Sequence, residues 1–535
     1  MGDRPGAIFA IRLLSDEGIV SIVRVGSALA SDVGRLGEDL PRFMREVMRN
    51  AMSRIALWGG LGFACLVGWG ASAHGQGPLG SGTSVGPRAL SSPGDHFRGA
   101  GSCSAVACHG GVSPSGHSSI LKNEHTTWIA DDPHALAYET LHGERSARIA
   151  RKLAGRSGKV IPAHQDERCL ACHSTPRPAA ELRRTEWMNR DGVSCEACHG
   201  ASEKWLGPHT TEGWSSLGAE IKERDYGFRP TRDLARRAGL CAECHVGDRK
   251  GGAGAEVAII KDVNHDLIAA GHPRLNFELA AYLDNLPPHW REKGRNAAPD
   301  FPALAWSVGQ VATTKAGLEL LRGRVGDARA PWPEFSEYGC FSCHHELADE
   351  PWRRNRAEGL AGSPHWGSWY LPMNGALAQE EQSAGRDPNG DWKAFETAIQ
   401  QLLNEMSRPI PKSGKVRELV GSALQPLDRR LDSVASRSFS AADAERVVNA
   451  FHDPRSWSKV ESWDQAAQRY LGIVPFRQVW VALAPDRRAD QDALGRELDA
   501  LRKRLMFGET LDSPQRGFAP ASLRGSSRPP LNIQI

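Results

Sequence analysis

Apolar residues recur at helical spacing in the C-terminal third of the chain. Between residues 415 and 435 they repeat every three or four positions, which is the pattern of a helix with one buried face. These positions are Val416, Leu419, Val420, Leu424, Leu427 and Leu431. The same kind of pattern predicts helices over residues 394–406, 441–451, 463–471 and 489–506. Pro426 interrupts the first pattern, so we expect either a kink or two shorter helices there.

The predicted helices divide the chain into two regions of different character. Residues 351–515 are expected to form a small all-α unit, followed by a loose tail over residues 516–535. Residues 100–350 show only short helical patterns with long coil between them, and no convincing strand pattern. The short helices are predicted at residues 135–153, 233–242 and 276–284. We therefore predict a fold that is mainly α with extensive coil.

A short apolar run near the N-terminus has the three parts of an export signal. Arg54 precedes an apolar stretch of 15 residues, and Ala71-Ser72-Ala73 fits a small-residue cleavage pattern. This predicts a signal peptide over residues 52–73, and the alternative is an uncleaved anchor helix. The protein is thus expected in the periplasm or otherwise exported in a bacterium, and membrane association is not required unless the signal stays uncleaved.

The segments on either side of this signal carry no predicted core. Residues 1–51 precede it, so we interpret them as a mis-called extension, with translation beginning near Met52. Residues 74–99 are rich in Gly, Ser and Pro, which predicts a flexible linker.

The cysteines are distributed unevenly along the chain, and this distribution indicates which chemistry the protein carries. The net charge of the 535 residues is only +3, which gives no reason to expect a nucleic-acid partner. Ten of the 11 cysteines lie between Cys103 and Cys343, and the remaining one, Cys65, lies within the predicted signal. Cysteines that served packing alone would not be sorted in this way.

Four pairs of cysteines occur as C-x-x-C-H, the attachment motif of c-type haem. Two thiols spaced in this way add to the two porphyrin vinyl groups, and the following histidine becomes the proximal iron ligand. The motifs are Cys169, Cys172 and His173; Cys195, Cys198 and His199; Cys241, Cys244 and His245; and Cys340, Cys343 and His344. Zinc sites and disulfides also use paired cysteines, but neither requires a histidine after every pair.

A fifth candidate has a longer spacer. Cys103, Cys108 and His109 form C-x-x-x-x-C-H, for which a local disulfide is the alternative. We predict five covalently attached c-type haems, four held by C-x-x-C-H and one by C-x-x-x-x-C-H. The porphyrins themselves would then provide the core of residues 100–350.

Histidine is the expected second axial ligand. Met188 is the only methionine between Cys103 and His344, so histidine–methionine ligation cannot be general. The chain holds 19 histidines. The candidate distal ligands are His134, His209, His272, His164 and His265, with His117, His125, His142 and His345 behind them. His365 and His452 are expected to be structural.

These motifs resemble the multihaem cytochromes c of the cytochrome c-554 type. The resemblance rests on Cys195-Glu-Ala-Cys198-His199-Gly, on the Asp-Pro-His134-Ala segment and on Ala-Gly-His272-Pro-Arg-Leu, and it covers roughly residues 100–345. It implies periplasmic electron transfer between redox partner proteins, and bis-histidine haems with sometimes one five-coordinate iron. The fifth, widely spaced site and the C-terminal helices depart from the family pattern.

Two functions therefore remain open. The first is an electron carrier in which no substrate binds iron, and no catalytic residue is assigned. The second is an oxidoreductase acting on a small nitrogen or sulfur compound at one five-coordinate haem. All five motifs end in histidine, whereas the pentahaem nitrite reductases use lysine at the catalytic haem, which favours the electron carrier.

Overall fold

The computed structural model describes residues 9–15, 18–25, 96–115, 120–155, 158–177, 185–249, 259–328, 330–344, 364–457, 460 and 462–506. The chain divides into two compact units, residues 1–85 and 86–535. In the first unit, β1 (Phe9–Ser15) and β2 (Gly18–Val25) form an antiparallel pair, with Phe9 opposite Val25. The predicted signal peptide, most of the predicted linker, His117, His345 and the predicted tail lie outside the described residues.

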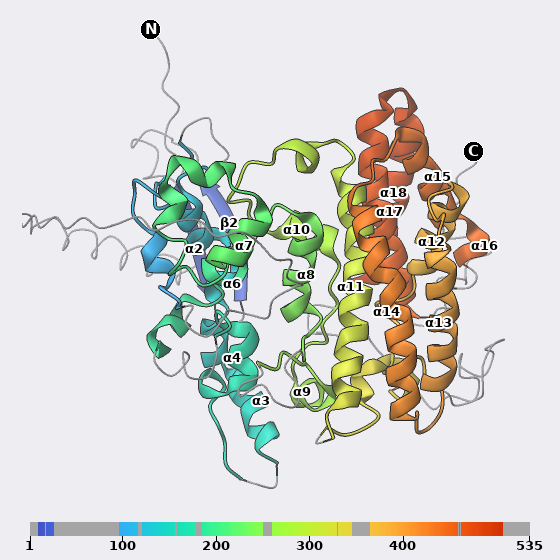
Figure 1. The fold of residues 1–535 in the computed structure, drawn as a ribbon, viewed down its shortest axis with the longest axis horizontal. Helices are drawn as coiled ribbons and strands as arrows, with labels where there is room; N and C mark the ends of the chain where they lie inside the picture. The colour runs from blue at the N-terminus through green and yellow to red at the C-terminus, as the bar shows by residue number, and fades with distance from the viewer. Residues whose placement is uncertain are drawn as a thin grey trace, which may run out of the picture. The chain divides into compact units, whose positions relative to one another are not determined.

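The region that holds the haem motifs consists of short helices joined by coil, as the sequence predicts (Figure 1). Its α-helices are α2 (Glu124–Asp131), α3 (Glu144–Ala154), α4 (Glu167–His173), α6 (Cys195–His199), α7 (Ala219–Tyr226), α8 (Leu234–His245), α9 (His265–Ala270) and α10 (Leu279–Asn285). Its 3-10 helices are η1 (Ala100–Cys103), η2 (Pro133–Leu136), η3 (Glu139–His142), η5 (Ala163–Gln165), η6 (Glu186–Asp191), η7 (Pro208–Thr210), η8 (Glu212–Ser216) and η9 (Gly294–Ala297).

Two of the three short helices predicted in this region are confirmed, and one prediction is wrong. α8 and α10 lie where the sequence places them. The continuous helix predicted over residues 135–153 is instead broken into η2, η3 and α3. The break comes at Gly143, whose extended backbone ends one helical segment and begins the next.

The C-terminal part of the chain is built from long helices, which Figure 1 shows packed beside one another. They are α11 (Phe301–Gly326), α12 (Asn374–Ser383), α13 (Asp391–Met406), α14 (Ser413–Ala435), α15 (Ala441–His452), α16 (Pro454–Trp457), α17 (Trp463–Leu483) and α18 (Arg488–Leu505). The short elements η10 (Phe335–Glu337), η11 (Cys340–Ser342) and η13 (Pro485–Arg487) complete this part. None of the helices in the described ranges is both long and apolar enough to cross a bilayer.

The five helices predicted here are confirmed, with two differences. α17 continues to Leu483, well past the predicted end at residue 471. α14 runs unbroken past Pro426, so the alternative of two shorter helices is wrong. Pro426 is buried against the neighbouring helices, and this packing offsets the backbone hydrogen bond that proline cannot donate.

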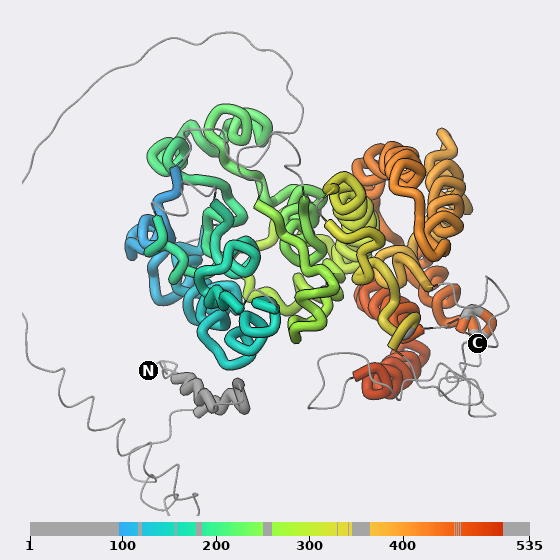
Figure 2. The backbone as a smooth tube through the Cα atoms, turned by 90° about the horizontal axis from the view of Figure 1, so that it is seen from below, coloured from blue at the N-terminus to red at the C-terminus, as the bar shows by residue number. Residues whose placement is uncertain are grey.

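The sequence pattern missed α11, the longest helix in the described residues. α11 packs against α8, α10, α14 and α17, and Figure 2 shows it, in yellow, between the haem-motif region and the other long helices. Seventeen of its 26 residues are buried. A helix that is buried on most sides shows little contrast between polar and apolar faces, which explains why the periodicity was absent.

The apolar cores of the two regions differ greatly in size. One continuous cluster of buried residues runs from Leu234 on α8 to Leu505 on α18. Between residues 100 and 170 the buried clusters are small, and one of them holds only Ala100, Trp128 and Ala135. From α8 onward the chain therefore has an apolar core of its own, so the expectation of a porphyrin core over residues 100–350 is wrong there. For residues 100–170 it stays a prediction.

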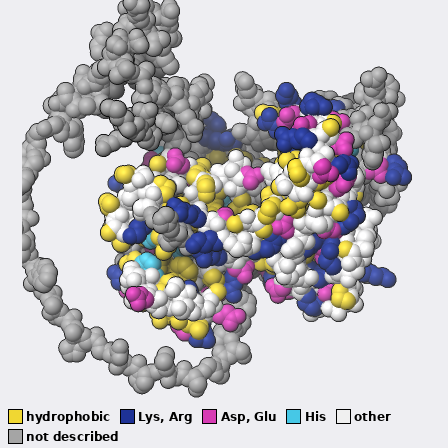
Figure 3. Space-filling model, turned by 90° about the horizontal axis from the view of Figure 1, so that it is seen from above, with side chains coloured by type: hydrophobic (Ala, Val, Ile, Leu, Met, Phe, Trp, Pro, Cys, Tyr) yellow, Lys and Arg dark blue, Asp and Glu magenta, His cyan; other side chains and the backbone are white. Residues whose placement is uncertain are grey.

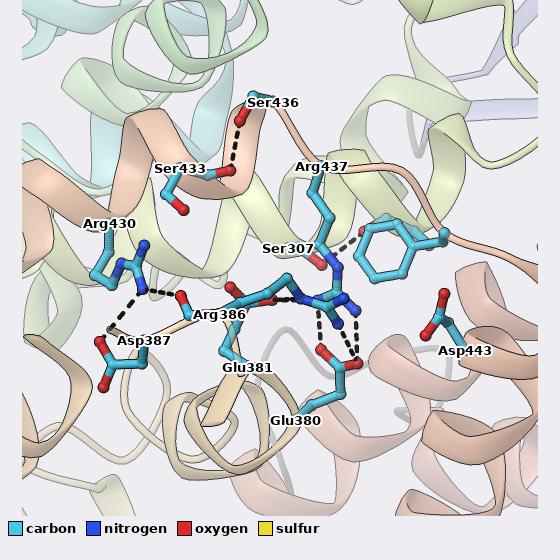
Figure 4. Close-up of polar contacts among 12 residues, drawn as sticks. Ser307, Glu380, Glu381, Arg386, Asp387, Arg430, Ser433, Ser436, Arg437 and Asp443 are labelled. Carbon is cyan, nitrogen blue, oxygen red and sulfur yellow. Dashed lines mark hydrogen bonds and ion pairs between the residues drawn. The ribbon is translucent and has the colours of Figure 1, made fainter. Parts of the chain in front are cut away.

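Arg437 lies at the centre of a buried ionic network that joins α12 to the segment after α14 (Figure 4). Its guanidinium contacts Glu380 and Glu381, with a hydrogen bond of 2.5 Å to Glu381, and lies 3.9 Å from the ring centroid of Phe439. Burial raises the pKa of Glu381, and the positive charges of Arg437 and Arg386 oppose that shift.

We expect Arg437→Met to destabilise the protein by about 3 kcal/mol, because it removes a buried cation shared by Glu380 and Glu381 and leaves the more exposed Arg386 to pair with both carboxylates. The free energy of unfolding can be followed by far-UV circular dichroism in urea. Lys415→Met is the matched control, since Lys415 pairs with Glu418 at 2.7 Å on the exposed side of α14. Its expected cost is at most about 1 kcal/mol. Equal costs for the two variants would contradict the prediction.

Candidate haem-binding sites

Three of the C-x-x-C-H motifs have helical backbone at both cysteines, and the fourth has it at its first cysteine. α4, α6 and α8 each end on the histidine of a motif, at His173, His199 and His245 respectively. In the last motif, η11 begins at Cys340. Helical backbone places two cysteines three residues apart on the same side of the turn, so both thiols face one edge of a porphyrin.

The widely spaced first motif reaches a similar geometry through a turn. The backbone N–H groups of Cys108, His109 and Gly110 all donate to the carbonyl oxygen of Ala105. The backbone around Cys108 and His109 therefore turns much as it does in a helix. No disulfide joins any of the ten described cysteines from Cys103 to Cys343, so the structure does not support the alternative disulfide between Cys103 and Cys108.

Four of the five proximal histidines face a second histidine at a nearly constant distance. The ring centroids are 6.3 Å apart for His109 and His209, 6.0 Å for His134 and His245, 6.4 Å for His173 and His272, and 6.4 Å for His265 and His344. A histidine nitrogen binds a transition metal at about 2 Å, which places the centroids of two opposed axial imidazoles about 6 Å apart. These pairs therefore fit a haem iron held between the two rings.

Hydrogen bonds at Nδ1 orient several of these rings. Glu124 Oε2 lies 2.8 Å from His109 Nδ1, and Asp132 Oδ1 lies 2.9 Å from His134 Nδ1. Carbonyl oxygens take this role for His173 (Ala137), His209 (Leu206) and His272 (Pro273). A partner at Nδ1 leaves Nε2 as the nitrogen that can bind iron, and it also holds the ring plane in place.

The charged partners and burial shift the pKa values of the histidines in opposite directions. Hydrogen bonds donated to the carboxylates of Glu124 and Asp132 raise the pKa values of His109 and His134, respectively. Burial lowers the pKa of His245 to about 4, which keeps that imidazole neutral at physiological pH. Neutral imidazole is the form that binds iron.

His199 differs from the other proximal histidines. Its ring is stacked with Phe228, with centroids 5.5 Å apart and planes 21° apart. Burial lowers its pKa to about 4, and its Nδ1 atom is buried without a hydrogen-bond partner. His289 lies within electrostatic range of this ring.

One predicted distal candidate is not brought to a proximal histidine. His164 is stacked on His142 with ring centroids 4.4 Å apart, which is too close for an iron between them. Among the lesser candidates, His125 lies beside Trp128. His452, which was expected to be structural, is paired with Glu497 at 3.2 Å in the C-terminal helices. Figure 3 shows histidine side chains, in cyan, exposed in a hollow lined with hydrophobic side chains.

The sequence analysis did not identify the side chains that orient the rings. Asp132 has a recognisable local signal, because an Asp before Pro-His is a helix N-cap, and its side chain accepts from His134 N–H. Glu124 is 15 residues from His109, and only the fold brings the two together.

The motifs also approach one another through their cysteines. Cys195 lowers the pKa of the Cys103 thiol, and Cys172 lowers that of Cys244, so the two thiols of each pair lie close together. Cys198 lies within electrostatic range of both Cys241 and Cys244. The first motif (at Cys103) is thus a neighbour of the third (at Cys195), and the second (at Cys169) is a neighbour of the fourth (at Cys241). The contact between the third and fourth motifs connects these two pairs.

These sites define a protein that holds covalent c-type haem. Residues 102–200 match the family model described as cytochrome c554 and c-prime. The chain is also 27% identical over 150 residues to cytochrome c-554 of Nitrosomonas europaea, and the matched part is 24% of this chain and 54% of that protein. The chain thus spans about half the length of the curated relative it matches. No solved structure matches the chain.

These matches support a cytochrome c-554-type family for this chain. This likeness implies covalently bound c-type haem as the cofactor. The resemblance that the sequence motifs suggested is thereby confirmed.

Proposed function

We propose that this protein is an exported cytochrome with five c-type haems, which carries electrons between redox partner proteins in the bacterial periplasm. The observation that supports it best is the recurrence of the iron-sized spacing in four separate histidine pairs. Four unrelated pairs of surface histidines would not share this spacing by chance. The export signal in the sequence supports the location.

In this proposal each haem has named protein ligands. The ten cysteines from Cys103 to Cys343 hold the porphyrins through thioether bonds. The axial pairs are His109 with His209, His173 with His272, His245 with His134, and His344 with His265. Each bound iron supplies one-electron exchange between its ferric and ferrous states. The chain contributes ring orientation through the Nδ1 partners and keeps neighbouring haems close together.

The approach of the cysteines supports a continuous path for electrons. The order of neighbouring motifs is first, third, fourth and second. The fifth follows the second, because their distal candidates flank one short helix: His265 begins α9, and His272 follows its last residue by two positions. Closely packed haems pass electrons without any substrate at the iron, so a carrier needs nothing further.

The test is haem stoichiometry combined with the spin state of the ferric protein. Five haems per chain that survive denaturation are expected, with at least four low-spin irons that do not respond to added cyanide. The measurements are mass spectrometry, visible absorption and electron paramagnetic resonance. Fewer than five covalent haems, or mainly high-spin iron, would contradict the proposal.

The alternative function is an oxidoreductase that acts on a small nitrogen or sulfur compound at one haem. The stacking of Phe228 on His199 favours it, since a phenyl ring cannot ligate iron. The haem at His199 is then the candidate for an open coordination position. One high-spin iron that binds nitric oxide and turns over nitrite or hydroxylamine supports the enzyme. If His289 binds this iron instead, the protein has a fifth low-spin iron, and this result excludes the enzyme function.

A further inference from the structure

Arg274 is a buried cation between two of the proposed haem sites. It follows His272, the candidate ligand of the second haem, by two residues. It also lies within electrostatic range of Cys340, the first cysteine of the fifth motif. Only 14% of its side chain is exposed. A charge buried this close to the fifth motif acts on its haem through a medium of low dielectric constant.

The partner of Arg274 comes from the C-terminal helices. Asp464, the second residue of α17, accepts a hydrogen bond of 2.7 Å from the guanidinium and is 7% exposed. Ser368 accepts from Arg274 at 3.2 Å and donates to Asp464. Burial lowers the pKa of Arg274, but the negative charge of Asp464 more than compensates and the pKa is raised. The guanidinium and the carboxylate thus form a direct, buried ion pair.

The segment that carries Ser368 also joins the fifth motif to the helices. His365 N–H donates to Ser342 Oγ, and Gly339 N–H donates to the carbonyl oxygen of His365. Trp369 donates to the carbonyl oxygen of Phe277 and stacks on Trp463 of α17, with centroids 5.8 Å apart. The position of Asp464 relative to the fifth motif is thus determined by a connected set of contacts.

We propose that the C-terminal helical unit tunes the reduction potential of the fifth haem, through Asp464, which balances the buried charge of Arg274. This inference rests on the proposed function, because it takes the motif at Cys340 to carry a haem. Reduction adds one negative charge to a haem, so a nearby cation favours the ferrous state and a nearby carboxylate opposes it. In the intact pair the two effects nearly cancel.

The test is a cycle of charge-removing variants, followed by optical redox titration of the haem-loaded protein. Asp464→Asn leaves Arg274 unbalanced, and we expect a tenfold rise in the reduced-to-oxidised ratio of one haem at fixed potential. This corresponds to about 59 mV for a one-electron couple. Arg274→Gln leaves Asp464 unbalanced and shifts the same haem in the opposite direction. The double variant returns close to the wild-type potential.

If the two residues had only a structural role, both variants would shift the reduction potential in the same direction, because each would open the site to water. The shifted haem is identified as the fifth by its disappearance in Cys340→Ala/Cys343→Ala. Asp391→Asn is the matched control, since Asp391 is equally buried and pairs with Arg429 within the helices at 2.6 Å.

The outcomes separate this inference from the proposed function. Suppose that the protein carries five haems, but that Asp464→Asn and Arg274→Gln shift the reduction potential in the same direction, or by no more than Asp391→Asn does. This result overturns the tuning by Asp464 and leaves the proposed function standing. A wild-type chain that carries no haem at Cys340 and Cys343 overturns both.

Discussion

His272→Ala is expected to convert one haem in five from a six-coordinate, low-spin iron to a high-spin iron. The ring of His272 faces His173 at 6.4 Å, and its Nδ1 atom is held by the carbonyl oxygen of Pro273 at 2.8 Å. Without this imidazole one axial position is open, and the weaker ligand field leaves the iron high-spin. Electron paramagnetic resonance of the ferric protein measures the change, and added cyanide should bind the new site.

The matched control is His142→Ala. His142 lies in the same region, but its ring is stacked on His164 at 4.4 Å, so it has no place in an iron pair. Removing His142 should not change the spin state of any iron relative to the wild type. A high-spin iron in His142→Ala, or an unchanged spectrum in His272→Ala, would show that the ring spacing does not identify the axial ligands.

Cys241→Ala/Cys244→Ala is expected to remove one covalent haem and to divide the electron path in two. The fourth motif lies beside Cys172 and Cys198, so its haem would connect the first and third haems to the second and fifth. After denaturation the variant should retain four haems. Flash or pulse reduction should then show two groups of haems that exchange electrons much more slowly than in the wild type.

Loss of a terminal haem provides the comparison for this prediction. Cys103→Ala/Cys108→Ala also reduces the haem count by one, but Cys103 has its neighbour only in Cys195. The four remaining haems should still equilibrate as a single group. Equally fast equilibration in both variants would contradict the order of haems inferred from the cysteine contacts.

Sequence patterns predicted those features that depend only on neighbouring residues, such as contiguous motifs and helices with one buried face. The C-x-x-C-H motifs are contiguous, and Glu-Ala between Cys195 and Cys198 continues the helical turn that presents both thiols. The amphipathic helices α13, α14 and α15 were also predictable, because each buries one face and exposes the other. The break at Gly143 was missed, since a single glycine inside a helical pattern is often tolerated.

The sequence by itself determined the five candidate haem-attachment motifs, the expectation of histidine as second ligand, and most of the C-terminal helices. The tertiary structure decided which histidine faces which, because partners such as His109 and His209 lie in separate elements and no local pattern links them. It also decided that α11 is a helix and that Asp464 reaches Arg274 across the chain. Attachment to a porphyrin is a property of five to seven consecutive residues. Axial pairing and charge balance depend on distances in space, which only the packing of the whole chain sets.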